Sequence, residues 1–83
     1  MSDFQIKVVA FGIARDIMGG KQLELVVQEG ATVSIAMSLL KEKFPAFEQL
    51  TSLNLAINEE YVNGDYQIKS GDELVLIPPV SGG

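Results

Sequence analysis

Apolar side chains alternate with other residues along the first segment of the chain, as they do in a β-strand. In a strand over residues 4–11, every second residue lies on the same face, and on one face these residues are apolar: Phe4, Ile6, Val8 and Ala10. The opposite face begins with polar side chains but ends in Val9 and Phe11. The pattern therefore predicts a strand whose second face becomes apolar toward its end.

A second strand is predicted over residues 22–28. Its apolar side chains Leu23, Leu25 and Val27 fall on one face, and Gly30 ends it. The glycine-containing segment 12–21 joins the two strands. We expect it to be a connection, with a short helical turn around Arg15.

After Gly30 the spacing of the apolar residues changes from that of a strand to that of a helix. The residues with helical spacing are Val33, Ala36, Met37, Leu40 and Phe44. Thr32 is a suitable N-cap, because its hydroxyl can accept a hydrogen bond from a backbone N–H of the first turn. Lys41 and Lys43 suit the negative end of the helix dipole. Pro45 disfavours helical geometry in the residue before it, so the helix should end there.

Two further strands are predicted in the second half of the chain. Alternating apolar residues indicate a short strand over 53–57, and the run ELVLI at 73–77 indicates a final, strongly apolar strand. Residues 45–52 form a connection, and residues 61–62 are extended or a brief strand. Turn signals separate these elements at Asn63-Gly64 and Ser70-Gly71-Asp72.

The order of these elements is typical of an α+β domain, with one main helix packed on one face of a mixed sheet. The first and last strands are the most apolar, so we expect them side by side at the centre of the sheet. The ubiquitin-like β-grasp is the compact fold with this element order. A chain of 83 residues suits one domain. We expect that domain over residues 1–77 and an extended tail over 78–83.

The charge balance and the missing residue types narrow the possible functions. The chain has 6 Lys and Arg against 11 Asp and Glu, a formal net charge of −5, and neither Cys nor His. The acidic excess argues against nucleic acid, whose binding relies on Lys and Arg that displace counterions. The missing thiolate and imidazole groups remove the commonest nucleophile, general base and metal ligands. These absences count against a stand-alone enzyme, and we expect no metal or cofactor bound by this chain.

The sequence shows no signal for membrane insertion or secretion. No apolar stretch approaches the ~18 residues of a membrane span. The N-terminus lacks the basic start and apolar run of a signal peptide. We therefore expect a cytoplasmic protein that does not bind membranes.

The last six residues have the composition of a tail that can enter another protein. They are Pro78, Pro79, Val80, Ser81, Gly82 and Gly83. The prolines cannot donate ladder hydrogen bonds, so the last strand must end before them. Six residues at ~3.3 Å each span roughly 20 Å. The two glycines lack Cβ atoms, which makes the end narrow and leaves the α-carboxylate of Gly83 unhindered. A frayed terminus has a similar composition, but it does not explain Pro-Pro directly after a central strand.

A candidate binding surface lies on the two central strands. Val9 and Phe11 in the first strand and Val75 and Ile77 in the last make the second face apolar, although a single helix can cover only one face. These four residues are candidates for a hydrophobic patch that binds a partner, with partial cover by loops or chance exposure as the alternative. Arg15 is a candidate for a specific basic contact near the tail.

The chain resembles the small, sulfur-carrying subunit of molybdopterin synthase over nearly its whole length. Residues 11–19 (FGIARDIMG) are similar to the opening motif of that family, aromatic-x-x-x-Arg-Asp/Glu-x-x-Gly, and residues 57–62 (INEEYV) to its V-N-x-x-x-V segment. Residues 71–83 (GDELVLIPPVSGG) resemble its ending, which is the most specific of the three motifs. One departure is Ile77, where other members often carry Phe.

The resemblance implies how the tail is used. An activating enzyme related to ubiquitin E1 would use ATP to adenylate Gly83, and a sulfur donor would convert the adenylate to a thiocarboxylate. The carrier would then dock on the large subunit of molybdopterin synthase, in a heterotetramer, and insert its tail into that subunit's active site. There the sulfur would pass to a cyclic pyranopterin precursor of the molybdenum cofactor. The catalytic side chains would belong to the large subunit, so this chain would be a sulfur-donating, non-catalytic subunit.

Three other functions stay open at this point. A ubiquitin-like modifier would use the same activated Gly83 but become joined to lysines of other proteins. A sulfur carrier for another pathway, such as thiazole synthesis, is related, although those carriers are usually shorter and lack Pro-Pro-Val before Gly-Gly. A passive interaction domain would have an inert tail.

Overall fold

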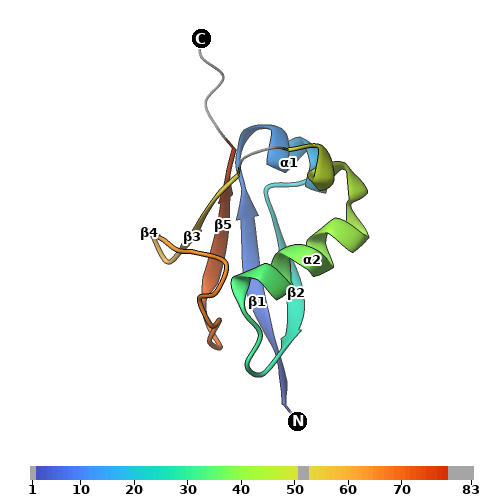
Figure 1. Ribbon diagram of the computed structural model, residues 1–83. Helices are drawn as coiled ribbons and strands as arrows, with labels where there is room; N and C mark the ends of the chain where they lie inside the picture. The colour runs from blue at the N-terminus through green and yellow to red at the C-terminus, as the bar shows by residue number, and fades with distance from the viewer. Residues whose placement is uncertain (1, 51–52, 79–83) are drawn as a thin grey trace.

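The computed structural model describes residues 2–50 and 53–78. These residues form one mixed sheet whose inner face is covered by helices (Figure 1). In chain order the elements are β1 (Asp3–Ala10), α1 (Gly12–Met18), β2 (Gln22–Gln28), α2 (Val33–Lys43), the 3₁₀ helix η1 (Pro45–Gln49), β3 (Asn54–Ile57), β4 (Glu60–Tyr61) and β5 (Glu73–Ile77). The expected α+β architecture, with one main helix on one face of a mixed sheet, is confirmed.

The first and last strands lie side by side in the sheet, as the sequence predicts. The strand order is β2-β1-β5-β3-β4. The β1–β5 pair is parallel, with Val9 opposite Val75, whereas the other neighbouring strands run antiparallel. Because parallel strands end on the same side of a sheet, the ends of β1 and β5 lie together.

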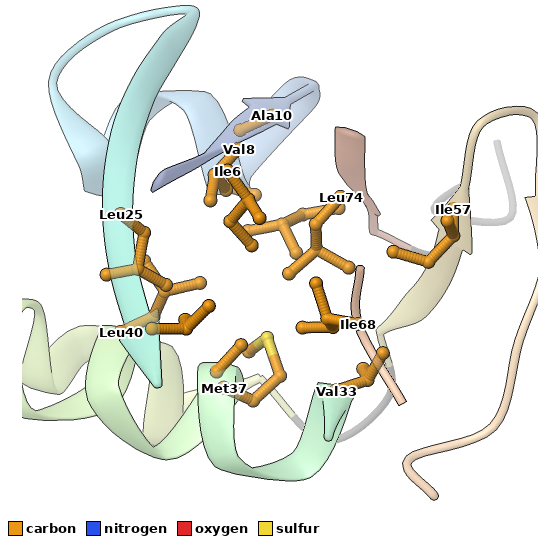
Figure 2. Packing of buried hydrophobic residues seen from close by; sticks show 14 of the residues in the cluster. Ile6, Val8, Ala10, Leu25, Val33, Met37, Leu40, Ile57, Ile68 and Leu74 are labelled. Carbon is orange, nitrogen blue, oxygen red and sulfur yellow. The ribbon is translucent and has the colours of Figure 1, made fainter. Parts of the chain in front are cut away.

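One face of the sheet carries the core. Val33, Met37 and Leu40 of α2 point toward Ile6 and Val8 of β1 and toward Leu74 of β5 (Figure 2). Leu74 and Leu40 are fully buried. Thr32 caps α2 as predicted, because its Oγ1 accepts a hydrogen bond from the backbone N–H of Ile35 at 3.3 Å.

The segment after β1 is more regular than the sequence predicts. A complete helix, α1, replaces the expected connection with a single turn around Arg15. Ala14 and Met18 are four residues apart on one face of α1, and both are buried. Gly19 ends the helix in the left-handed conformation (φ 73°), and its N–H donates to the carbonyls of Arg15 and Asp16. Burial of these two side chains against the rest of the core stabilises a helix that the flanking glycines made hard to predict.

The segment after α2 also contains structure where the sequence predicts a connection. Pro45 begins the 3₁₀ helix η1, which buries Phe47. The rings of Phe44 and Phe47 meet edge to face, with 6.1 Å between their centroids. This pair fixes the turn that follows α2.

Truncating neighbouring side chains on the two faces of β5 should lower the free energy of unfolding by very different amounts. Leu74 faces the core and is fully buried, whereas Val75 is half-buried on the opposite face. We expect Leu74→Ala to lower the free energy of unfolding by about 2–5 kcal/mol. Val75→Ala should cost about 1 kcal/mol or less, because little of its side chain leaves a packed site. Urea unfolding of both variants measures the difference, and equal costs would contradict this assignment of the two faces.

Candidate functional site

The face of the sheet opposite the helices carries an apolar row across four strands. Strand register places Val9 beside Val75, Val75 beside Ala56, and Ala56 beside Tyr61. Residues that are paired in register point to the same side of a sheet. The side chains of β1, β5, β3 and β4 therefore meet on this open face.

Phe11 extends this row beyond the end of β1. Its backbone is extended, and its N–H donates to the carbonyl of Leu76 at 3.2 Å, which continues the β1–β5 pairing by one step. The side chain of Phe11 is 48% exposed, and Val9, Val75 and Ile77 are half-buried. All four of the predicted patch residues line one hollow of about 470 Å³. We call this hollow, with its lining residues, the open-face patch.

Tyr61 is a patch residue that the sequence interpretation missed. It is 73% exposed and lines the same hollow, together with the polar side chains of Gln22, Glu59 and Glu73. Its place depends on the hairpin between β3 and β4, whose two turn residues, Asn58 and Glu59, both have positive φ (49° and 78°). The sequence indicates only that residues 61–62 are extended, so neither the hairpin nor the register could be read from it.

Arg15 lies on α1, at the end of the sheet where β1 and β5 finish. Its side chain is exposed and is not part of the lining of the open-face patch. Because α1 begins directly after Phe11, Arg15 is four residues along the chain from the open-face patch. Its expected role as a basic partner contact stays a prediction.

The tail begins at the same end of the sheet. Pro78 follows β5 and lies against Gly12, where a Cβ would come within 3.3 Å of the Pro78 Cγ. Gly12 also has a positive φ of 57°, a backbone conformation that glycine adopts without strain. The base of the predicted tail is therefore placed beside Phe11. The other predicted tail residues lie outside the described residues: Pro79, Val80, Ser81, Gly82 and Gly83.

Asp72 is a buried carboxylate that organises turns. It is 8% exposed and accepts hydrogen bonds from the backbone N–H of Lys69 at 2.8 Å and the Asn58 side-chain amide at 3.0 Å. The Tyr66 hydroxyl donates at 3.5 Å to Asp72 Oδ2, the oxygen that also accepts from the Lys69 N–H, and partial burial and the Asp72 carboxylate raise the pKa of Tyr66. Asn58 in turn accepts from the N–H of Glu73 at 3.1 Å. The network joins the β3–β4 hairpin to the start of β5, so Asp72 has a structural role.

The described residues hold neither a candidate metal site nor a membrane-spanning helix. Residues 2–50 and 53–78 contain no group of three or more acidic side chains placed to bind a metal ion. None of the helices in these ranges has the length and apolar character needed to cross a membrane.

The fold and the open-face patch define a ubiquitin-like β-grasp protein with its C-terminal strand at the centre of the sheet. Residues 8–83 match the ThiS family, and the chain belongs to that family.

Two curated relatives illustrate the likeness. The chain is 40% identical over 83 residues to the molybdopterin synthase sulfur carrier subunit of Arabidopsis thaliana, a match that covers 99% of this chain and 86% of the relative. It is 32% identical over 84 residues to the protein of the same name from Dictyostelium discoideum, which covers 95% and 96% of the two chains.

Solved structures share the fold. A putative molybdopterin converting factor subunit 1 from Pyrococcus furiosus has a TM-score of 0.87 and 28% identity, over 93% of this chain and 99% of that one. Small archaeal modifier protein 1 from Haloferax volcanii has a TM-score of 0.84 and 26% identity, over 93% and 99%. One chain in a complex of subunits 1 and 2 of the molybdopterin-converting factor from Helicobacter pylori has a TM-score of 0.66 and 26% identity, over 96% and 100%.

The Asp72 network predicts a stability effect. We expect Asp72→Ala to lower the free energy of unfolding by about 2–4 kcal/mol, because the Lys69 N–H and the Asn58 amide lose their acceptor. Asp65→Ala is the control, since Asp65 is exposed and its removal should change stability by about 0.5 kcal/mol or less. Chemical denaturation measures both. Unchanged stability of Asp72→Ala, with weaker binding to a partner, would instead make Asp72 a contact residue.

Proposed function

We propose that this chain is the sulfur carrier subunit of a molybdopterin synthase. The observation that carries the proposal is the ThiS family match, which runs through the last residue, Gly83. The names of the curated relatives support the same function. The structure adds a physical basis: the open-face patch and the base of the tail lie at one end of one sheet, so a single partner could contact both.

In the proposed cycle the reacting group is the terminal carboxylate. A carboxylate oxygen of Gly83 attacks the α-phosphorus of ATP on an E1-like enzyme, and pyrophosphate leaves. A sulfide-level nucleophile (HS⁻) supplied by a sulfur donor then attacks the acyl carbon and displaces AMP, which gives the thiocarboxylate. Delivery of that sulfur to the cyclic pyranopterin precursor returns Gly83 to a carboxylate, with one oxygen taken from water. We place these steps in the cytoplasm.

The large subunit is the proposed partner for sulfur delivery. In the Helicobacter pylori structure a similar chain is complexed with a second subunit of the molybdopterin-converting factor. We propose that the large subunit binds the open-face patch of this chain and covers Val9, Phe11, Val75 and Ile77. Arg15 would contact it at the margin of this interface. The tail would enter the large subunit's active site. The absence of His and Cys from this chain agrees with catalytic side chains on the partner.

A ubiquitin-like modifier is the second candidate function. The likeness to small archaeal modifier protein 1 favours it, because the two proteins share the fold and the match covers nearly the whole of both chains. Both functions require activation of Gly83, and they differ in whether sulfur or a lysine amine attacks the adenylate.

The fate of Gly83 distinguishes these functions. We expect mass spectrometry of the C-terminal peptide, from protein isolated from its own cells, to show one oxygen replaced by sulfur. The peptide is required because oxidation of Met gives nearly the same change in intact mass. Deletion of Gly83 should abolish sulfur transfer and leave docking largely intact, since the open-face patch remains. Isopeptide linkage of Gly83 to lysines would support the modifier, and undiminished sulfur transfer by the deletion variant would overturn the sulfur-carrier function.

The open-face patch should supply the docking affinity. We expect Phe11→Asp and Ile77→Asp each to weaken binding to the large subunit by about 2–4 kcal/mol, because a carboxylate would be buried in an apolar contact. Isothermal titration calorimetry measures the affinity, and circular dichroism checks that each variant is folded. Gln67→Asp adds the same charge at an exposed position outside the patch and should bind normally. Unfolding of Phe11→Asp would place that residue in the core and contradict the prediction.

A further inference from the structure

A second surface lies along the free edge of β2, away from the open-face patch. Figure 1 shows β2 at one edge of the sheet beside α2. Two hollows, of about 530 and 450 Å³, follow this edge and share Val26 of β2 and Leu39 of α2, so they form one continuous groove. Val26 and Ile35 in its walls are 52% and 49% exposed. We call this feature the β2-edge groove.

The backbone of β2 offers hydrogen-bonding groups to this groove. The N–H of Ala10 donates to the carbonyl of Lys21 at 3.0 Å, and the N–H of Glu29 donates to that of Ser2 at 2.8 Å. Hydrogen-bonded and non-bonded pairs alternate along an antiparallel ladder. From this register, Leu23, Leu25 and Val27 bond to β1, and the alternate residues along the groove direct their N–H groups outward: Glu24, Val26 and Gln28. Within the described residues, β2 pairs with no strand on that side.

The charges on the groove walls select one kind of occupant. Asp3, Glu24, Glu29 and Glu42 line the two hollows, against a single basic side chain, Lys43. A strand that adds to β2 would place alternate side chains against the apolar wall, and basic side chains among the others would meet these carboxylates.

Two occupants from this protein itself fit poorly. Pro78 lies at the level of Gly12, whereas Glu24 pairs with Lys7, so the nearest part of the groove is about 17 Å away along β1 and about 10 Å across two strand spacings. The straight-line separation is about 20 Å. Residues 79–83 extend at most about 18 Å beyond Pro78, so these five residues cannot lie along the groove. Two copies joined edge to edge would bring like charges together, which destabilises a strand pair.

We propose that the β2-edge groove is a second docking site, for an extended partner segment that alternates apolar residues with Lys or Arg. The segment adds to the sheet as a new strand beside β2. This inference is independent of the proposed sulfur-carrier function, because it uses neither the tail nor the open-face patch. A partner segment bound beside β2 leaves the open-face patch accessible.

The test uses the full chain, labelled with ¹⁵N, and a synthetic peptide of about eight residues that alternates Val and Lys, long enough to follow β2. We expect chemical-shift changes along β2 and the outer side of α2. The specific signature is slower hydrogen exchange at the outward N–H groups of Glu24, Val26 and Gln28. The N–H groups of Leu25 and Val27 already bond to β1 and should change little. A matched peptide that alternates Val and Glu should not bind.

Paired charge reversals test the selectivity. Glu24→Lys with Glu42→Lys should weaken binding of the Val–Lys peptide at least about tenfold. Glu60→Lys with Asp65→Lys makes the same change in net charge at the opposite edge of the sheet and should have little effect. Both double variants change only side chains that are exposed.

Four outcomes would overturn the proposal. The first is the absence of binding by the Val–Lys peptide. The second is a set of shifts spread over the whole acidic surface without the alternating protection. The third is equal weakening by the two charge-reversal pairs. The fourth is concentration-dependent protection of the same amides without peptide, which would identify a second copy of the chain as the occupant.

Discussion

The parallel pairing of β1 with β5 is the constraint on which the rest of this structure depends. Parallel neighbours finish at the same side of a sheet. The end of β1, where Phe11 leads into α1, is therefore brought beside Ile77 and Pro78. An antiparallel β5 would place the C-terminal tail beside the N-terminus of β1 and far from Phe11. The direction of one strand thus joins the candidate docking surface to the base of the tail.

The same pair of strands explains why the open face is apolar. Parallel strands usually have both faces covered, and their sequences are apolar on both sides. In β5, Leu74 and Leu76 are buried beneath the helices, but Val75 and Ile77 are only half-buried on the other face. No helix or strand of the described residues covers that face. Its composition is that of a surface completed by another protein, which is the role given to it in the proposed function.

Much of the fold could be predicted because local and tertiary preferences agree. Hydrophobic periodicity identified α2 and the three long strands, and Thr32 and Pro45 marked the limits of the helix. The central positions of β1 and β5 followed from their apolar character. What was missed depends on contacts distant in sequence: α1 is stabilised by burial of Ala14 and Met18, and η1 by burial of Phe47. Neither burial can be read from a short window of sequence.

The candidate site was predictable to a similar degree, and for the same reason. Strand alternation put Val9, Phe11, Val75 and Ile77 on one face, and the structure brings these four side chains into one hollow. Tyr61 could not be found, because its position requires the register of the β3–β4 hairpin, which the positive φ angles of Asn58 and Glu59 set.

The proposed function and this geometry together impose an order on the partners. Because the patch and the base of the tail lie at one end of one sheet, an enzyme that binds the patch would also occupy the tail. Two enzymes that each require Gly83 therefore cannot bind at the same time. Under the proposed function, the carrier would have to leave the activating enzyme before it reaches the large subunit, so the patch would have to bind each of them only moderately. A surface of this size on a chain of 83 residues suits such exchange, since affinity follows a few anchoring side chains rather than area. The edge of β2 is free of this conflict, because a segment bound there would cover neither the patch nor the tail.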